Sequence, residues 1–177
     1  MFRGELIENR VVVWDFEEAR KLYGRGFYGK PLGIPKPKGP DFEAPLLLDL
    51  MEAHYLMEKG ILEIHEEGKP VKVRRLRTLC RKEYLEFDRK YKVYKALREA
   101  GLVVTPGIKF GSDFAVYKKG PGLEHAPFLI QVLRPNDPIT ATQIILAGRL
   151  ATTVRKHFIV ALAGEKLVFL GFEWWKA

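Results

Sequence analysis

Residues 116 to 133, VYKKGPGLEHAPFLIQVL, place a tyrosine, two lysines and a histidine between two apolar runs. Tyr117 and His125 lie eight positions apart, and Lys156 follows further along the chain. Together these three residue types can do acid–base chemistry without a metal. Histidine titrates near neutral pH, lysine carries a positive charge, and a phenol can take or relay a proton. The same residue types are common on surfaces that have no function, so both interpretations stay open on the residues alone.

The elements expected around these residues place all three at element ends. Tyr117 ends the first of the two strands expected in this region, and His125 begins the next. Lys156 lies where a helix expected over 138–155, capped by Asp137, passes into the strand KHFIVALAG. Side chains at element ends can converge on a rim while the core stays packed.

The rest of the second half indicates an α/β layer arrangement. Tyr84, Phe87, Tyr91, Tyr94 and Leu97 form one stripe of a helix expected over 83–100, closed by Gly101. Such a stripe could stack on bases, but helical spacing is more typical of a core, and we favour packing on a sheet. Strands in LVVTPGIKFG and KLVFLGFEWW complete a pattern of helix, three strands, helix and two strands.

The first half has a looser pattern. Residues 4–14 predict a strand turning at Glu8–Asn9, followed by a short helix capped by Asp15. GKPLGIPKPKGP predicts an irregular loop, residues 45–59 a helix, and ILEIHE with GKPVKV a hairpin. The basic stretch VRRLRTLCRK is ambiguous, and we expect the boundary near it. The sequence therefore predicts a small N-terminal α/β domain over 1–80 and a C-terminal domain over 81–177.

Composition limits the classes of partner. The 177 residues are 47% hydrophobic, enough for a folded core, and their apolar runs are too short to span a bilayer. Cys80 is the only cysteine, which excludes an internal disulfide and a cysteine zinc cage. A net charge of +8 and a pI near 9.5 favour a polyanionic partner, nucleic acid before membrane. The start of the chain has no apolar signal core, so we expect a cytoplasmic protein.

The run GIKFGSDFAVYKKGPGLEHAPF resembles the catalytic motif of the tRNA-splicing endonucleases. The pattern of glycines, a basic residue, aromatics, an acid, a tyrosine and a histidine is met by Gly107, Lys109, Phe110, Gly111, Asp113, Phe114, Tyr117 and His125. The family's later lysine, which follows a helix, is met by Lys156 in RLATTVRKHFIVAL. The resemblance covers residues 101–177, and LLLDLMEAHYLMEKGILEI more loosely resembles the family's N-terminal segment.

The resemblance implies an archaeal-type endonuclease that removes introns from precursor tRNA. It implies a C-terminal nuclease domain with a mixed central sheet flanked by helices, similar to restriction endonucleases. Cleavage at a bulge–helix–bulge would need no cofactor and no metal, and would leave 2′,3′-cyclic phosphate and 5′-hydroxyl ends. Tyr117 would take the 2′-hydroxyl proton, His125 would protonate the leaving oxygen, and Lys156 would stabilise the transition state.

The resemblance also suggests how RNA is held. Arg149, seven positions before Lys156, matches a family residue that stacks on a bulge base, and this spacing is two turns of a helix. Trp174 or Trp175 is the candidate for the second stacking residue; burial in a subunit interface explains both tryptophans equally well. Two cleavage sites in one substrate imply a homotetramer, or a heterotetramer with a non-catalytic homologous subunit.

Other residues and other classes of protein were weighed against this interpretation. We favour a solvated turn for Lys118 and Lys119, structural roles for His54 and His65, and the opposite strand face for His157. A non-catalytic structural subunit or a basic RNA-binding module would not need Tyr117, His125 and Lys156 at the family's spacing. A metal-dependent nuclease would need paired carboxylates, and Asp113 has no evident partner in the sequence.

Overall fold

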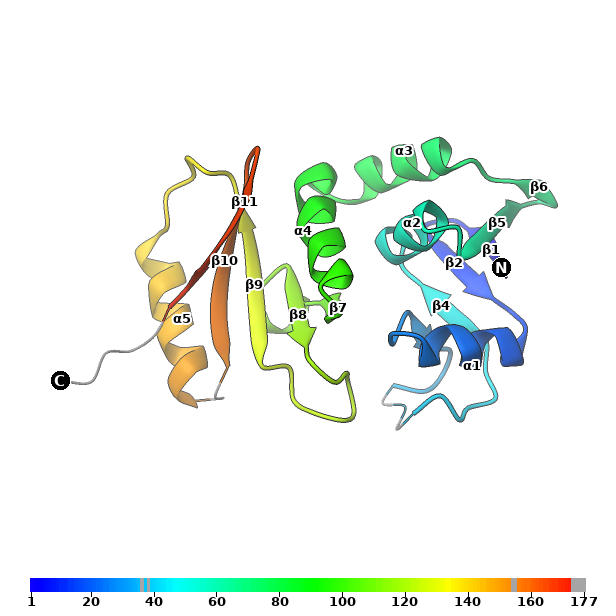
Figure 1. Ribbon diagram of the computed structural model, residues 1–177, viewed down its shortest axis with the longest axis horizontal. Coiled ribbons are helices and arrows are strands. Elements are labelled where there is room, and N and C mark those ends of the chain that lie inside the picture. Colours follow the sequence, from blue (N-terminus) through cyan, green and yellow to red (C-terminus); the bar gives the residue numbers. More distant parts are fainter. Residues whose placement is uncertain (36, 38, 154–155, 173–177) are drawn as a thin grey trace. The chain divides into compact units, whose positions relative to one another are not determined.

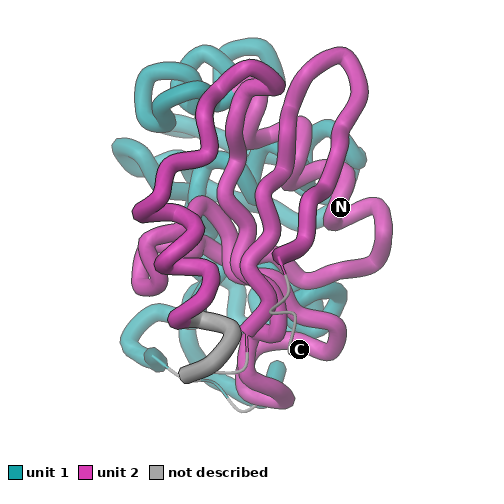
Figure 2. The backbone as a smooth tube through the Cα atoms, turned by 90° about the vertical axis from the view of Figure 1, so that its left-hand side faces the viewer, with its two compact units in different colours: residues 1–87 teal, residues 88–177 magenta. Residues whose placement is uncertain are grey.

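The computed structural model describes residues 1–35, 37, 39–153 and 156–172. The chain divides into two compact units, residues 1–87 and residues 88–177, which Figure 2 shows in different colours. Each unit combines one sheet with helices, so the α/β class predicted from the sequence is confirmed.

Among the described residues, the sheet of the first unit has six strands, and both hairpins expected from the sequence are present. Its strands are β1 (Phe2–Ile7), β2 (Arg10–Val13), β3 (Lys30–Pro31), β4 (Leu46–Leu48), β5 (Leu62–Glu66) and β6 (Lys69–Pro70), in the order β3-β4-β2-β1-β5-β6. β1 and β2 pair antiparallel across the predicted turn, where Glu8 has a φ of 54°. β1 and β5 are parallel neighbours, and β5 and β6 form the second hairpin.

Two helices of this unit begin with aspartate caps. Asp15 accepts a 2.8 Å hydrogen bond from the backbone N–H of Glu18 at the start of α1 (Phe16–Gly24), as predicted. Asp49 and Glu52 form a reciprocal capping box at the start of α2 (Leu50–Glu58). The helix expected from residue 45 begins five positions later because Leu46–Leu48 pair with β2 as strand β4.

The ambiguous basic stretch forms helix α3 (Val73–Glu83), whose beginning lacks these features. Its N-cap residue, Lys72, makes no capping hydrogen bond, and its first turn has no acidic residue. Arg74 and Arg75 lie there instead, next to the positive end of the helix dipole, where a cation costs about 0.3–1 kcal/mol. α3 is held by its packing on α2, through the buried Leu76 and Cys80. The Cys80 thiol donates to the carbonyl oxygen of Leu50, and burial raises its pKa to about 12.

The second unit has the order predicted from the sequence: helix, three strands, helix and two strands (Figure 1). Its elements are α4 (Phe87–Glu99), β7 (Val103–Pro106), the short 3-10 helix η1 (Ile108–Phe110), β8 (Phe114–Tyr117), β9 (Phe128–Leu133), α5 (Ala141–Thr153), β10 (His157–Ala163) and β11 (Leu167–Gly171). The sheet order is β11-β10-β9-β8-β7; β9 and β10 are parallel, and the other neighbours are antiparallel.

The aromatic stripe of α4 belongs to the core and not to a base-stacking surface. Phe87, Tyr91, Tyr94 and Leu97 are all buried, and the Tyr94 ring lies 6.0 Å from that of Phe114 in β8. The expected helix start at residue 83 was wrong. α3 extends to residue 83, and the chain then turns through residues 84–86 before α4 begins.

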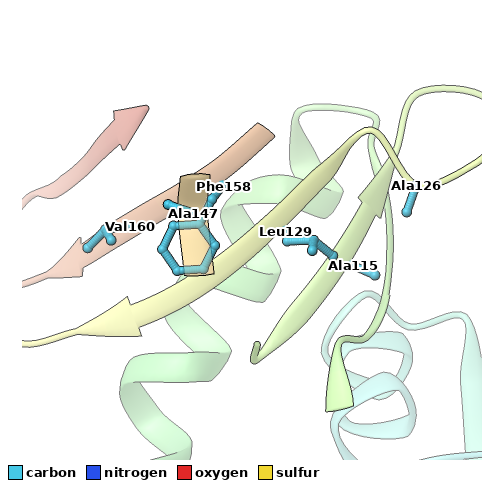
Figure 3. Packing of buried hydrophobic residues seen from close by; sticks show 6 residues of the cluster. All are labelled: Ala115, Ala126, Leu129, Ala147, Phe158 and Val160. Atoms are coloured by element: carbon cyan, nitrogen blue, oxygen red, sulfur yellow. The ribbon is translucent and has the colours of Figure 1, made fainter. Parts of the chain in front are cut away.

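α5 covers the opposite face of the same sheet. Figure 3 shows the buried cluster, which consists of Ala115, Ala126, Leu129, Ala147, Phe158 and Val160. Burying a side chain such as Phe158 contributes about 1.5–3 kcal/mol. The helix begins at Ala141 and not at residue 138, and Thr140 with Gln143 forms its capping pair. The predicted cap was wrong: Asp137 instead accepts from the N–H of Arg134 in the preceding turn.

None of the helices in the described ranges combines the length and apolar character needed to cross a membrane.

Candidate active site

The ends of three neighbouring strands bring two of the expected catalytic residues into one row. The sheet register pairs one residue each from β8, β9 and β10: Val116, Phe128 and His157. One position further toward that end of the sheet, Tyr117, Pro127 and Lys156 are therefore aligned. The backbone N–H of His157 donates to the carbonyl oxygen of Pro127 at 2.8 Å, which closes the parallel β9–β10 ladder at this end.

Strand alternation places Tyr117 and Lys156 on the sheet face that α5 covers. Successive residues of a strand point to opposite faces, so residues two apart share a face. Two positions further into the sheet, the row consists of Ala115, Leu129 and Phe158, all in the buried cluster of Figure 3. Tyr117 is half-buried and packs against the same cluster. The core beneath the row therefore orients the residues at its rim.

Lys156 is held in a defined position by two contacts. Its side-chain nitrogen donates a 2.6 Å hydrogen bond to the carbonyl oxygen of Ala126, and it lies 4.8 Å from the centroid of the Phe110 ring. The residue is only 8% exposed, and burial lowers the pKa of its ammonium group. An ammonium group has three N–H donors, so two donors remain beyond the bond to Ala126. This arrangement suits stabilisation of a negative charge.

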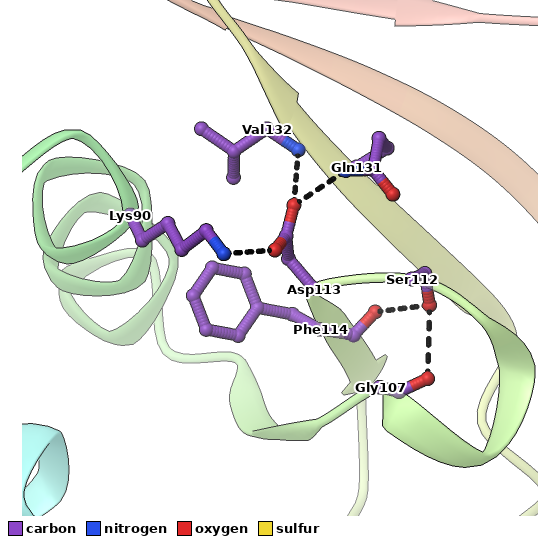
Figure 4. A network of polar contacts seen from close by, with 7 residues as sticks. All are labelled: Lys90, Gly107, Ser112, Asp113, Phe114, Gln131 and Val132. Atoms are coloured by element: carbon purple, nitrogen blue, oxygen red, sulfur yellow. Dashed lines mark hydrogen bonds and ion pairs between the residues drawn. The ribbon is translucent and has the colours of Figure 1, made fainter. Parts of the chain in front are cut away.

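The glycines of the motif shape the loop that carries Phe110. A Cβ atom at Gly107 would lie 2.5 Å from Ser112 Oγ and 2.8 Å from the backbone of Phe114, so a side chain does not fit there. Gly111 ends η1 with a φ of 69°, a conformation that glycine adopts readily. Ser112 Oγ lies 3.3 Å from the carbonyl oxygen of Gly107 and 3.4 Å from that of Phe114 (Figure 4), and it can donate to either. The closed loop thus presents Phe110 to Lys156.

Asp113 fixes this loop to its surroundings (Figure 4). One carboxylate oxygen accepts from the backbone N–H of Val132 and from the side-chain amide of Gln131, both at 2.8 Å. The other oxygen lies 2.7 Å from the side-chain nitrogen of Lys90 on α4. Asp113, which had no evident partner in the sequence, therefore links the motif loop to β9 and to α4.

His125 lies in the connection between β8 and β9, exposed to solvent. It directly precedes Ala126, the residue whose carbonyl oxygen accepts from Lys156. The connection has internal structure: the Glu124 carboxylate accepts from the N–H of Lys119 at 2.5 Å, and this bond lowers the pKa of Glu124. Gly120 and Gly122 have positive φ angles of 128° and 87°. The connection that carries His125 therefore has internal hydrogen bonds, and it contacts Lys156 through the carbonyl oxygen of Ala126.

His157 and Lys118 lie on the other side of the sheet. The His157 ring is 5.7 Å from the Phe128 ring, and the Lys118 nitrogen lies 5.6 Å from the centroid of the same ring. His157 thus points to the face opposite Lys156, as strand alternation predicted. Lys118 is exposed, as expected for a turn residue, but it also contacts an aromatic ring that the sequence did not suggest.

Of the three residues expected to hold RNA, only Arg149 lies among the described residues. Arg149 lies exposed on α5. Its seven-residue spacing from Lys156 does not represent two helical turns, because α5 ends at Thr153 and Lys156 precedes β10. Trp174 and Trp175 lie outside the described residues.

The other two histidines lie beside glutamates in the first unit. His54 is fully buried in α2, 3.4 Å from Glu58, and His65 lies 3.3 Å from Glu63. Among the residues that the structure describes, no three His, Cys, Asp or Glu side chains are grouped so that they could hold a metal ion.

The contact between Phe110 and Lys156 was not predicted from the sequence. Phe110 was a matched motif position, but it lies far from Lys156 in the chain, and no local pattern indicates such a contact. The link between Asp113 and Lys90 was missed for the same reason.

Comparison with known proteins matches both halves of the chain to one family. Residues 87–168 match the catalytic C-terminal domain of tRNA intron endonucleases, and residues 2–77 match the N-terminal domain of the same family. The chain is 49% identical to a tRNA-splicing endonuclease of Hyperthermus butylicus, over 99% of both chains. It is 41% identical to one of Sulfurisphaera tokodaii over 98% of both chains, and 44% identical to one of Pyrobaculum arsenaticum over 97% of this chain and 98% of the relative.

Proposed function

The chain belongs to the tRNA intron endonuclease family, and on that premise we propose that it cuts introns out of precursor tRNA at bulge–helix–bulge motifs. The protein is an endoribonuclease of this family. The proposal adds the motif that is cut, the residues that do the chemistry and the ends that are left.

The proposed reaction is a transfer of the phosphate from one ribose oxygen to another. The 2′-oxygen forms a bond to phosphorus while the bond from phosphorus to the leaving 5′-oxygen breaks. Tyr117 takes the proton from the 2′-hydroxyl, and His125 gives a proton to the 5′-oxygen. The products are a 2′,3′-cyclic phosphate and a 5′-hydroxyl, and the step needs neither water nor a metal ion.

The placement of Lys156 is the observation that carries the proposal. The extra negative charge on the phosphate in the transition state needs a donor that is already in position. The Lys156 ammonium is held by Ala126 and Phe110 in the same row as Tyr117, and His125 precedes Ala126. A charged lysine that is 8% exposed costs folding energy, which a solvated surface lysine would not. The site therefore fits a role in charge stabilisation better than a chance surface cluster.

In this proposal, the planar side chains of an arginine and a tryptophan hold the bulge base. An arginine plane can stack on an unpaired base and attract its phosphate. Arg149 is exposed on α5, as such a role requires. Trp174 or Trp175 would take the other side of the base.

The proposed assembly is a homotetramer, or a heterotetramer with a non-catalytic homologue, because two bonds must be cut in each substrate. β11 is an edge strand of its sheet, and its Val168, Phe169 and Leu170 are 47%, 42% and 37% exposed. An exposed apolar edge strand is prone to pair with another strand. The C-terminal strand is therefore the segment that we assign to subunit pairing.

A cleavage assay with end analysis tests the proposed chemistry. A bulge–helix–bulge RNA is incubated with the protein in excess EDTA, and a matched RNA carries a single 2′-deoxyribose at the cut position. We expect cleavage of the first RNA to cyclic phosphate ends and no cleavage of the second. A 3′-hydroxyl product, or loss of activity in EDTA with recovery on adding magnesium, would contradict the proposal.

A further inference from the structure

Helix α3 and its N-cap residue carry more than half of the net positive charge of the protein. Residues 72–83 have six cationic side chains and one acidic side chain, a net charge of +5, whereas the whole chain has +8. The other 165 residues therefore share only +3. All six cations are exposed: Lys72, Arg74, Arg75, Arg77, Arg81 and Lys82. The net charge of this short stretch is thus larger than that of the rest of the chain.

Three of the arginines form a ridge on one side of this helix. Leu76 and Cys80 mark the side of α3 that packs against α2. Arg74, Arg77 and Arg81 follow one another at spacings of three and four residues, which aligns side chains along a helix. Their positions span about 10 Å along the helix axis. That length is comparable to several successive phosphates on one strand of a duplex.

The charges at the start of α3 do not serve the stability of the helix. Lys72 and Arg74 lie where the helix dipole favours acids, and like charges three or four residues apart repel each other. The same unit caps its other two helices with Asp15 and Asp49 and places glutamates in their first turns. α1 and α2 thus follow the rule that acidic residues stabilise the N-terminus of a helix, and α3 does not. Such a departure indicates a functional surface. The charges of α3 therefore point to a partner that is negatively charged.

We propose that the α3 ridge, formed by Arg74, Arg77 and Arg81, binds the phosphate backbone of the double-helical parts of the RNA substrate. The proposal rests on precursor tRNA being the substrate, and it adds a binding surface in the N-terminal unit to the site in the C-terminal unit. Guanidinium groups bind phosphate through paired N–H donors, and such contacts position RNA without reading its sequence. The ridge would thus recognise RNA as a polyanion, whatever the sequence of the intron.

The test compares two triple variants that lose the same charge. The first is Arg74→Gln with Arg77→Gln and Arg81→Gln. The control is Arg10→Gln with Lys21→Gln and Lys69→Gln, three exposed cations of the same unit that do not form a ridge. The probes are a precursor tRNA transcript and an RNA duplex of unrelated sequence, and Kd is measured at several salt concentrations.

The ridge variant is expected to raise Kd for both probes about tenfold or more, and to reduce the salt dependence of binding by about one phosphate contact for each arginine removed. The control is expected to change Kd much less. If the two variants weaken RNA binding equally, the effect comes from net charge alone and the proposal is overturned. Unchanged RNA affinity with an altered mass of the assembly would assign α3 to a protein interface and overturn it too. The precursor carries a 2′-deoxyribose at each cut position, so binding is measured without turnover and a failure of the proposed chemistry would not affect this result.

A single variant separates binding from folding. Lys72→Asp supplies the missing N-cap and reverses one charge beside the ridge. We expect Tm to rise while the affinity for the RNA duplex falls. A lower Tm with unchanged affinity would mean that the charge serves the fold, against the proposal.

Discussion

The side-chain nitrogen of Lys156 lies 4.8 Å from the centroid of the Phe110 ring, within the range of a cation–π contact. Phe110 lies in the loop after β7, and Lys156 directly precedes β10, so the contact joins two parts of the family motif. The ring shields the ammonium group from water on one side, and the carbonyl oxygen of Ala126 accepts from it. Phe110 is therefore a positioning residue for the proposed charge-stabilising lysine.

Replacing the ring tests this contact. Phe110→Leu keeps an apolar side chain but removes the π face, and we expect kcat to fall about tenfold with little change in KM. Phe110→Tyr keeps the face and should retain most activity. Equal activity of the two variants would show that the ring only fills space.

The lowered pKa of Lys156 predicts opposite pH effects on stability and on activity. Between its folded pKa and the usual value of 10.5, the unfolded chain binds more protons, so the contribution of Lys156 to stability increases with pH there. Below the folded pKa the destabilisation by the buried charge is fully present. The free energy of unfolding of the parent, minus that of Lys156→Met, should therefore increase as pH rises through this window. Cleavage by the parent should fall over the same range. A difference that stays constant with pH would contradict the shift.

The ion pair and hydrogen bonds of Asp113 predict a loss of stability when this residue is replaced. Asp113→Ala leaves Lys90 without its ion pair and the N–H of Val132 without its acceptor. We expect a loss of about 2–3 kcal/mol in unfolding free energy, at the lower end for a buried pair because Lys90 remains 27% exposed. Denaturant unfolding measures it. In a double-mutant cycle, Lys90→Met should cost less in the Asp113→Ala background than in the parent. Strictly additive losses would show that the two side chains do not stabilise each other.

The fold was largely readable from the sequence because its periodic signals are strong. The order of elements in the second unit, the Asp15 cap and the burial of Tyr91 and Tyr94 followed from spacing alone. The errors lie at element boundaries, where tertiary pairing decides. Residues 46–48 have the apolar character of a helix start, but they pair with β2, and no local signal reveals that partner.

The contacts that surround the candidate site residues were not predicted. Tyr117, His125 and Lys156 came from the resemblance, and the structure places them at one end of the sheet in the catalytic unit. Their functional roles remain proposals. The contacts of Phe110 and Asp113 were not predictable, because they join residues far apart in the chain and depend on how the motif loop closes. Helix spacing was misapplied to Arg149, because α5 ends before Lys156.

Substrate holding by Arg149 can be separated from cleavage. Arg149→Ala should slow cleavage of a bulge–helix–bulge RNA, since a stacked contact is worth about 1–3 kcal/mol per base. Arg149→Lys keeps the charge without the flat group and should recover only part of the loss. A lysine variant equal to the parent would show that charge alone matters. Trp174→Ala and Trp175→Ala, compared in the intact assembly, would identify the second stacking residue.

The proposed general acid predicts a large and specific defect. His125 is exposed, so His125→Ala should leave the fold and the RNA affinity unchanged. Cleavage should fall about 10²–10⁴-fold, as is typical when a general acid is removed. Single-turnover rates and Kd for the same transcript distinguish a defect in chemistry from one in binding. Activity within a few-fold of the parent would remove His125 from the mechanism.

The most direct test of the proposed mechanism replaces the leaving oxygen with sulfur at the cut position of a bulge–helix–bulge RNA. A thiolate, whose conjugate acid has a pKa of about 8.5, leaves without being protonated, so His125 should no longer be needed. We predict that His125→Ala cleaves the sulfur-containing RNA at close to the parental rate, while Tyr117→Phe and Lys156→Met stay impaired on it. If His125→Ala remains as slow on this RNA as on the oxygen-containing one, His125 is not the acid, and the proposed division of roles among the three residues is wrong.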